Sequence, residues 1–144
     1  MNDPSSDIKG MKLYHHVDRV VNELRELGKD ESGPLKVDEL VAFDQLHYHG
    51  TEAVDEAIRA TGIHEGSSVL EVGSGLGGPA RYLAHSTGAA VTALELQEDH
   101  HLVASDLTAR CGLGGSVKHL CGDFLTHPWD GERFQAIVSW LTLY

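Results

Sequence analysis

The stretch Val69–Arg81, VLEVGSGLGGPAR, decides the fold. Its first four residues form an apolar run with a single acid, which predicts a buried strand. Glycines follow at positions 73, 75, 77 and 78, and Pro79 suits the first turn of a helix, where the N–H that proline lacks would have no partner. Glycine allows a sharp turn and a close approach of a ligand to the backbone. The stretch therefore predicts a strand, a glycine-rich turn and a helix, a junction at which parallel α/β sheets bind ligands.

The spacing of Gly73, Gly75 and Gly78 fits G-x-G-x-x-G, a pattern that also occurs in dinucleotide-binding proteins. Glu71 adds information, because a carboxylate at the end of a buried strand needs a partner. It would repel a pyrophosphate and attract a cation. A glycine turn without any ligand remains the alternative at this point.

The composition excludes several classes of protein. With 144 residues the chain can form one domain with a core, and a formal net charge of −11 argues against a nucleic acid partner. We find no apolar run long enough for a membrane span and no signal peptide, so we expect no membrane partner. Cys111 and Cys121 lack metal or redox spacing, which favours reduced thiols and a cytoplasmic location.

The chain before the glycine stretch is expected to fall into two parts. Residues 1–12 are polar and are predicted to be disordered. Residues 13–66 are predicted to form a helical lead-in: one helix ending near Gly28, a short helix over residues 37–43, and a third capped by Thr51.

Strands and helices alternate from residue 67 onward. We expect strands over residues 69–72, 89–96, 116–121 and 134–140, with helices over residues 79–87 and 97–110. Such alternation predicts an α/β fold with a Rossmann-like, doubly wound parallel sheet. In the strand order 3-2-1-4, the carboxyl ends of all four strands meet at the edge where such sheets bind ligands. That edge would hold the glycine turn, Glu95, Asp123 with Phe124, and Ser139 with Trp140.

With these positions in place, the sequence from Val69 to Tyr144 resembles class I methyltransferases that act on small molecules, similar to the sarcosine/dimethylglycine and sterol types. The resemblance rests on the form E-x-G-x-G-x-G, which begins at Glu71. It implies S-adenosyl-L-methionine as the cofactor, which carries a sulfonium and an ammonium and no phosphate. It also implies methyl transfer to a small molecule, for which we favour an amine. A nicotinamide-dependent oxidoreductase is the alternative enzyme, since Glu95 would fit a ribose there as well.

The resemblance assigns parts of the cofactor to residues of this chain. The methionine part falls on Gly73 and Gly75, and Glu71, Ser74 and Gly77 are also predicted to bind the cofactor. The ribose hydroxyls fall on Glu95, a carboxylate that accepts two hydrogen bonds at once, and the adenosine borders Leu96 and Gln97. The adenine falls on Asp123 and Phe124, and the methyl group is reached from Ser139 and Trp140. No catalytic residue is assigned.

A second unusual stretch, DQLHYHG, covers residues 44–50. It resembles the gating segment that precedes the glycine turn in the same methyltransferases and folds over the cofactor, which adds Tyr48 to the predicted site. A polar loop with one packed tyrosine is the alternative. A metal site at His47 and His49 would lack a third nearby ligand, so we expect no metal.

The family fold has seven strands, and this chain supplies four. We therefore expect a truncated methyltransferase, in which residues 67–144 form the cofactor-binding half of the domain. The alternatives are a short form that binds cofactor or a partner without catalysis, and a chain that completes its sheet with another. The strand over residues 134–140 would be an exposed edge with Ala136 and Val138 open to a neighbour, which predicts self-association.

Overall fold

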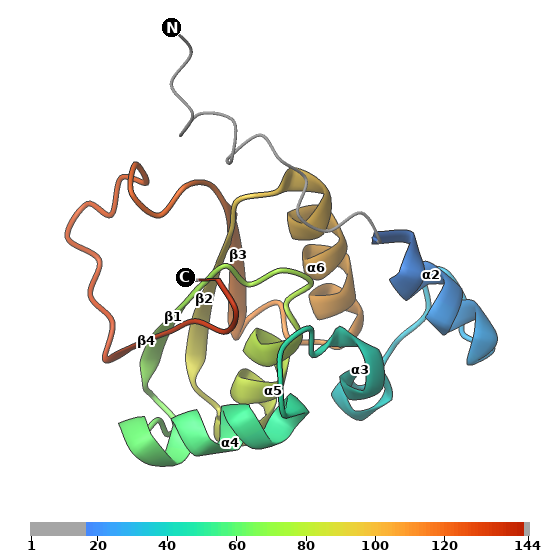
Figure 1. Cartoon of the computed structure of the whole chain (residues 1–144), viewed down its shortest axis with the longest axis horizontal. Helices are drawn as coiled ribbons and strands as arrows, with labels where there is room; N and C mark the ends of the chain where they lie inside the picture. Colours follow the sequence, from blue (N-terminus) through green and yellow to red (C-terminus); the bar gives the residue numbers. More distant parts are fainter. Residues whose placement is uncertain (1–16, 143–144) are drawn as a thin grey trace, which may run out of the picture.

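A computed structural model of the chain describes residues 17–142. The elements are, in order, α2 (Val17–Glu26), α3 (Val37–Asp44), α4 (Gly50–Thr61), β1 (Ser68–Val72), α5 (Gly78–Thr87), β2 (Ala90–Glu95), α6 (Glu98–Arg110), β3 (Val117–Cys121) and β4 (Ala136–Val138) (Figure 1). The segment expected to be disordered, residues 1–12, and the start of the predicted first helix lie outside the described residues.

The four strands form one parallel sheet in the order β3-β2-β1-β4. Val69 of the central strand pairs with Val91 of β2 on one side and with Ala136 of β4 on the other. A central strand of a parallel sheet is buried on both faces, which explains its apolar sequence. The predicted α/β fold and strand order are confirmed.

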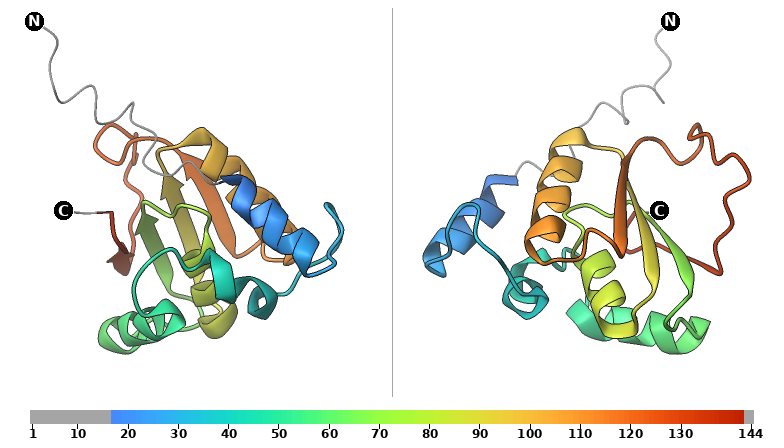
Figure 2. Two further views of the ribbon diagram at one scale, coloured as in Figure 1. Left: turned by 45° about the vertical axis from the view of Figure 1, so that its right-hand side comes forward. Right: turned by 180° about the vertical axis from the view of Figure 1, so that it is seen from behind.

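The two faces of the sheet are covered differently. Helices α4, α5 and α6 lie on one face, where Leu83 of α5 packs in the same core as Val69 (Figures 1 and 2). The segment 122–135 covers the other face, where Trp129 packs against Leu70. Helix α3 packs on α5, and helix α2 packs on α3 and α6; a second core that includes Leu40 and Leu107 joins these helices. The cavity described below opens where the first of these faces meets the carboxyl ends of the strands.

Residues with positive φ angles flank helices α4 and α5. Helix α5 begins after Gly77 and ends at Gly88, and both glycines have positive φ angles, 74° and 76°. The predicted cap Thr51 is wrong, because α4 already begins at Gly50 and Thr51 lies in its first turn. The cap is instead His49, in the left-handed region with a φ of 64°. Nothing in the sequence around His49 indicates a non-glycine residue in this conformation.

Strand β4 is shorter than predicted and turns a different face to solvent. It ends at Val138 because the Ser139 hydroxyl donates to the Val72 carbonyl at 2.9 Å. Ala136 and Val138, expected to be open, are 9% and 8% exposed, since they face the helices. The exposed residue is Ile137, at 60%, because successive strand residues alternate between faces.

No helix among residues 17–142 is both long enough and apolar enough to cross a bilayer.

Candidate functional site

A cavity of about 320 Å³ lies at the carboxyl ends of β1 and β2. Its size suits a small organic ligand. Most of the residues predicted from the glycine stretch and the end of β2 line it, together with Trp140 after β4. They are Glu71, Gly73, Ser74, Gly75, Glu95, Leu96, Gln97 and Trp140. The strand ends bring together residues from positions 71–97 and 140, as the topology predicts.

The glycine turn forms the floor of the cavity. The backbone N–H groups of Gly73 and Ser74 both donate to the Leu94 carbonyl, at 2.8 and 3.0 Å, which anchors the turn to β2. Gly75 has a φ of 52°, and a Cβ built on it would meet no atom within 4 Å. The turn therefore leaves open space beside the backbone at Gly75, where a ligand can approach.

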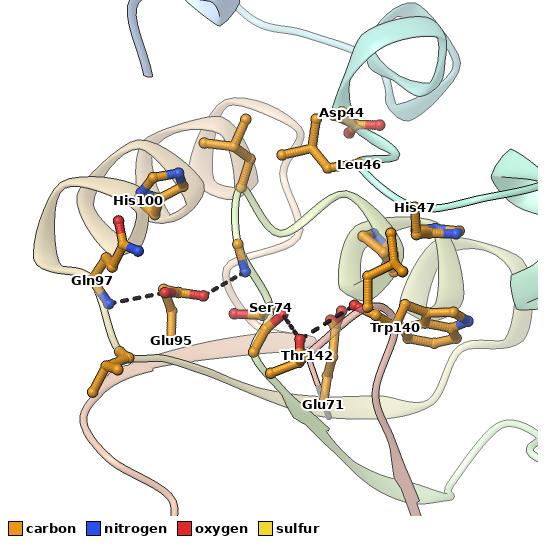
Figure 3. Close-up of a pocket in the computed structure, with 16 residues that line it drawn as sticks. Asp44, Leu46, His47, Glu71, Ser74, Glu95, Gln97, His100, Trp140 and Thr142 are labelled. Carbon is orange, nitrogen blue, oxygen red and sulfur yellow. Dashed lines mark hydrogen bonds between the residues drawn. The ribbon is translucent and has the colours of Figure 1, made fainter. Parts of the chain in front are cut away.

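Glu95 fixes the shape of this turn. Its Oε2 atom accepts a hydrogen bond from the Gly75 N–H at 2.7 Å, and its Oε1 atom accepts one from the Gln97 N–H at 2.9 Å (Figure 3). The residue is only 8% exposed. Each carboxylate oxygen has a second lone pair, so the carboxylate can still accept hydrogen bonds from a ligand.

Glu71 is a deeply buried acid of the cavity. It is 2% exposed, and its Oε2 atom has no hydrogen-bond partner among the described residues. Burial raises the pKa of Glu71 well above its ordinary value; the nearby Arg81 charge opposes this rise, and the Glu95 charge adds to it. A buried acid with one unpartnered oxygen is a suitable neighbour for a cationic ligand group.

The segment after α3 closes one side of the cavity, and a buried ion pair holds Asp44, the last residue of α3. The Arg81 guanidinium of α5 donates to Asp44 Oδ2 at 3.0 Å, with both side chains at most 1% exposed. Leu46 and His47 line the cavity, and the His47 ring stacks on Trp140 with centroids 5.7 Å apart (Figure 3). The segment therefore reaches the cavity, and its role as a gating segment stays a prediction.

The remaining predicted residues lie outside the cavity lining. Tyr48 is 75% exposed. Gly77 faces the α5–α6 contact, where an added Cβ would meet His119 and Arg81. Asp123 accepts a hydrogen bond from the Leu125 N–H, and the Phe124 ring contacts Trp129 at a tilt of 55°, with centroids 5.7 Å apart. The Ser139 hydroxyl is bound to Val72, as described above. The assignment of these residues to the cofactor stays a prediction.

Several lining residues had no predicted site role. They are Asp44, Leu46, His47, Leu76, Pro79, His100, Leu141 and Thr142. For Leu46 and His47 the resemblance of residues 44–50 to a gating segment was a usable signal. Thr142 follows Trp140 closely, but nothing in the sequence shows that its side chain packs over Gly73, where an added Cβ would lie 2.2 Å from its hydroxyl oxygen.

A buried polar chain runs from the cavity wall to β3 and gives a pH-dependent prediction. Arg81 donates to Thr108 at 3.2 Å, and Thr108 Oγ1 lies 2.8 Å from His119 Nε2. Burial, and then the charges of Arg81 and His101, lower the pKa of His119 to about 4. The unfolded chain, with a histidine pKa near 6.5, binds a proton between pH 6.5 and 4 that the folded chain does not.

Stability is therefore expected to fall as pH falls through this window, with His119 contributing up to about 3 kcal/mol of the loss. Chemical unfolding of wild type and His119→Gln across pH 6.5 to 4 checks this. The difference in free energy of unfolding between wild type and His119→Gln should shrink as pH falls. The free energy of unfolding of His85→Gln, at an exposed site on α5, should follow that of the wild type. Parallel profiles for wild type and His119→Gln would contradict the expectation.

The comparison with known families fits this geometry. A family model described as a methyltransferase domain matches residues 69–144, from β1 through the end of the cavity lining. The chain belongs to this methyltransferase family. The predicted family, fold class and cofactor class are thereby confirmed.

Curated relatives of this methyltransferase chain are named as sterol or cycloartenol methyltransferases. A sterol 24-C-methyltransferase of Gibberella zeae is 40% identical over 78 residues, which cover 54% of this chain and 20% of the relative. The cycloartenol-C-24-methyltransferase 1 of Oryza sativa subsp. japonica is 33% identical over 106 residues, covering 68% of this chain and 31% of the relative. The chain thus spans only about a fifth to a third of the length of these relatives.

Solved structures share the fold at low identity. A putative sarcosine dimethylglycine methyltransferase from Galdieria sulphuraria has a TM-score of 0.58 and 20% identity, covering 85% of this chain and 48% of that one. An S-adenosyl-L-methionine-dependent methyltransferase from Thiobacillus denitrificans, crystallised with S-adenosyl-L-homocysteine, also has a TM-score of 0.58 and 20% identity, covering 74% and 44%. These likenesses support the parallel methyltransferase fold.

Among residues 17–142 there is no group of three or more histidine, cysteine, aspartate or glutamate side chains placed to hold a metal ion. Both ring nitrogens of His47 already have partners, the Tyr48 carbonyl and the Gln45 side chain, each at 3.0 Å.

Proposed function

We propose that this chain binds S-adenosyl-L-methionine in the cavity at the ends of β1 and β2, as the cofactor-binding part of a small-molecule methyltransferase. The observation that supports this most directly is that a buried acid with one unpartnered oxygen, Glu71 Oε2, and the open backbone at Gly75 line the same cavity. A cofactor with cationic groups and no phosphates fits both features. Bound there, the cofactor would supply a methyl group on a sulfonium, which a nucleophile can accept because the neutral thioether is a good leaving group.

Different residues of the chain would bind different parts of the cofactor. The glycine turn leaves room for the methionine part, and Glu71 faces its positive charge. Glu95 would orient the ribose through the lone pairs that its two backbone hydrogen bonds leave free. Trp140, held by His47, would bound the methyl-transfer end and exclude water. Such positioning is the main contribution a protein makes to a displacement reaction with a good leaving group.

Calorimetric titration of one sample with S-adenosyl-L-methionine and with NAD tests the proposal. We expect binding of S-adenosyl-L-methionine and weaker or no binding of NAD, whose pyrophosphate would meet the acids at positions 71 and 95. Tighter binding of NAD would overturn the proposal in favour of an oxidoreductase.

Apolar side chains at the cavity mouth favour an apolar methyl acceptor. Leu46, Leu96 and Leu141 all line the cavity and are 39%, 46% and 38% exposed. The sterol methyltransferases among the relatives make a sterol the first acceptor to test. An amine, which the aromatic side chains also suit through cation–π attraction, is the alternative. Both can be offered in a radiolabelled methyl-transfer assay, which also separates an active chain from one that binds cofactor without catalysis.

Glu95→Ala should weaken cofactor binding by about 1.5–3 kcal/mol, because a charge-assisted contact is lost. It should also lower the free energy of unfolding by about 1–3 kcal/mol, since the N–H groups of Gly75 and Gln97 lose their acceptor. The sequence alone predicted little change in stability, so this second effect comes from the structure. Calorimetry and urea unfolding measure the two quantities on the same protein.

Glu98→Ala is a matched control, because Glu98 is an exposed acid at the start of α6. It should leave the affinity almost unchanged. If Glu95→Ala lowers stability and leaves affinity unchanged, Glu95 has only a structural role and its assignment to the ribose is wrong.

Self-association through β4 is a further proposal. Among the described residues β4 pairs only with β1, and Ile137 on this strand is 60% exposed. Unpaired strand edges with apolar side chains template association. In light scattering, the apparent molar mass of the wild type should rise with protein concentration, and Ile137→Lys should reduce this rise. A monodisperse wild-type monomer would contradict this.

The cytoplasmic location also remains a proposal, supported by the two unpaired cysteines, Cys111 and Cys121.

A further inference from the structure

Glu71 occupies a position where an ionised carboxylate is unfavourable. It lines the cavity at 2% exposure, and its Oε2 atom has no protein partner within residues 17–142. A buried charge without a partner costs several kcal/mol, and proteins avoid that cost by keeping the group neutral. Burial together with an unsatisfied carboxylate oxygen thus favours a protonated Glu71 in the free chain.

The charges that face Glu71 come from three elements. Arg81 of α5 is the favourable one, but its guanidinium is already bound to Asp44 of α3 at 3.0 Å. Asp44 and Glu95 of β2 both add negative charge, and the backbone N–H of Ala80 at the start of α5 gives a weaker opposing effect. His47 and His100 complete the titratable groups of the cavity lining. Burial, the largest influence, raises the pKa of Glu71.

We propose that Glu71 carries a proton in the free chain and releases it to solvent when a cationic group of the bound cofactor enters the cavity. This rests on the function proposed above. In the step the carboxylic O–H bond breaks, the proton passes to water or buffer, and the carboxylate keeps the electron pair and faces the cation. Nothing is oxidised or reduced.

Proton release makes binding depend on pH in a defined direction. While Glu71 is protonated in the free chain, each unit of rising pH should tighten cofactor binding by up to tenfold. Because both the ammonium and the sulfonium of S-adenosyl-L-methionine are cations, the choice of ligand can show which of them displaces the proton.

The test is isothermal calorimetry at pH 6.5 in buffers of different ionisation enthalpy, from which the number of protons released per ligand follows. At this pH an α-ammonium, with a pKa near 7.7–8.0, is almost fully protonated in solution and contributes little. Wild type should release about one proton more than Glu71→Gln on binding S-adenosyl-L-methionine. Glu56→Gln, at an exposed acid of α4, should release as many protons as the wild type.

Two further ligands identify the cation. S-Adenosyl-L-homocysteine keeps the ammonium and lacks the sulfonium, and 5′-methylthioadenosine has neither. Proton release with both S-adenosyl-L-methionine and S-adenosyl-L-homocysteine assigns the ammonium. Release with S-adenosyl-L-methionine alone assigns the sulfonium. Both results support the proposal. Equal release by wild type and Glu71→Gln, or release with 5′-methylthioadenosine as well, overturns it.

If Glu71→Gln does not fold, the wild-type affinity between pH 6 and 8 decides, and a flat profile overturns the proposal. Absence of binding by any of the three ligands would instead contradict the proposed function itself, so the two failures are distinguishable.

Discussion

Replacing Arg81 with methionine is expected to lower the free energy of unfolding by about 3–5 kcal/mol. Arg81 is fully buried, and its guanidinium bonds Asp44 Oδ2, the Ala104 carbonyl and the Thr108 hydroxyl at 3.0, 3.3 and 3.2 Å. Methionine would fill much of the space but leave the Asp44 carboxylate, 1% exposed, without its charged partner. Urea unfolding of the two proteins measures the loss.

The exposed ion pair of α4 provides the control. Arg59→Met removes a bridge to Glu56 whose side chains are 70% and 66% exposed, and it should cost well under about 1 kcal/mol. The double variant Arg81→Met with Asp44→Leu should recover part of the loss, because no buried charge is then left unpaired. An Arg81→Met variant as stable as Arg59→Met would show that the buried pair contributes little.

The second large effect is expected from Gly78→Ala, which should lower stability by about 1–3 kcal/mol or more. Gly78 begins α5, and a Cβ there would lie 2.2 Å from the Asp44 carbonyl oxygen, a backbone atom. Helix propensity alone would favour alanine by about 1 kcal/mol, so the sign of the change tests the packing directly. The same collision should push the segment after α3 away from the cavity and weaken cofactor binding.

Gly115→Ala is the matched control, since an added Cβ at Gly115 would meet nothing within 4 Å. It should change stability little or raise it slightly. A Gly78→Ala variant that matches Gly115→Ala in both unfolding and calorimetric affinity would show that α5 does not pack tightly on the residues before α4.

Local sequence signals predicted the sheet and much of the site. The run at β1, the glycine turn and the acid at the end of β2 are each visible in a few residues, and their spacing gives the parallel order that the structure has. The start of α6 was predicted within one residue, because Glu98 and Asp99 begin its first turn. Such features depend on neighbours in the sequence.

Features that depend on distant contacts could not be predicted. Arg81 was visible only as the end of a motif, because its partner Asp44 lies 37 residues earlier and meets it through the packing of α3 on α5. The second role of Glu95, as acceptor for the Gly75 N–H, requires the turn to fold back over β2. β4 was predicted too long because Phe134 and Trp140 are apolar and partly buried by tertiary contacts without belonging to the strand. Phe134 packs on the other face of the sheet, and Trp140 packs on the same core as Ala136 and stacks on His47.

The place of β1 in the sheet has a consequence for the order in which the chain is made. A ribosome releases β1 before either of its partners, and β2 soon follows, but β4 emerges only after β3 and the long segment behind it. Pairing of Val69 with Ala136 must therefore close a much longer loop than its pairing with Val91. Until Trp140 and Thr142 have left the ribosome, the glycine turn stands open on one side. Full burial of Glu71 is accordingly a late event in synthesis, and a nascent chain holding only β1 and β2 has the acid of the site without its walls.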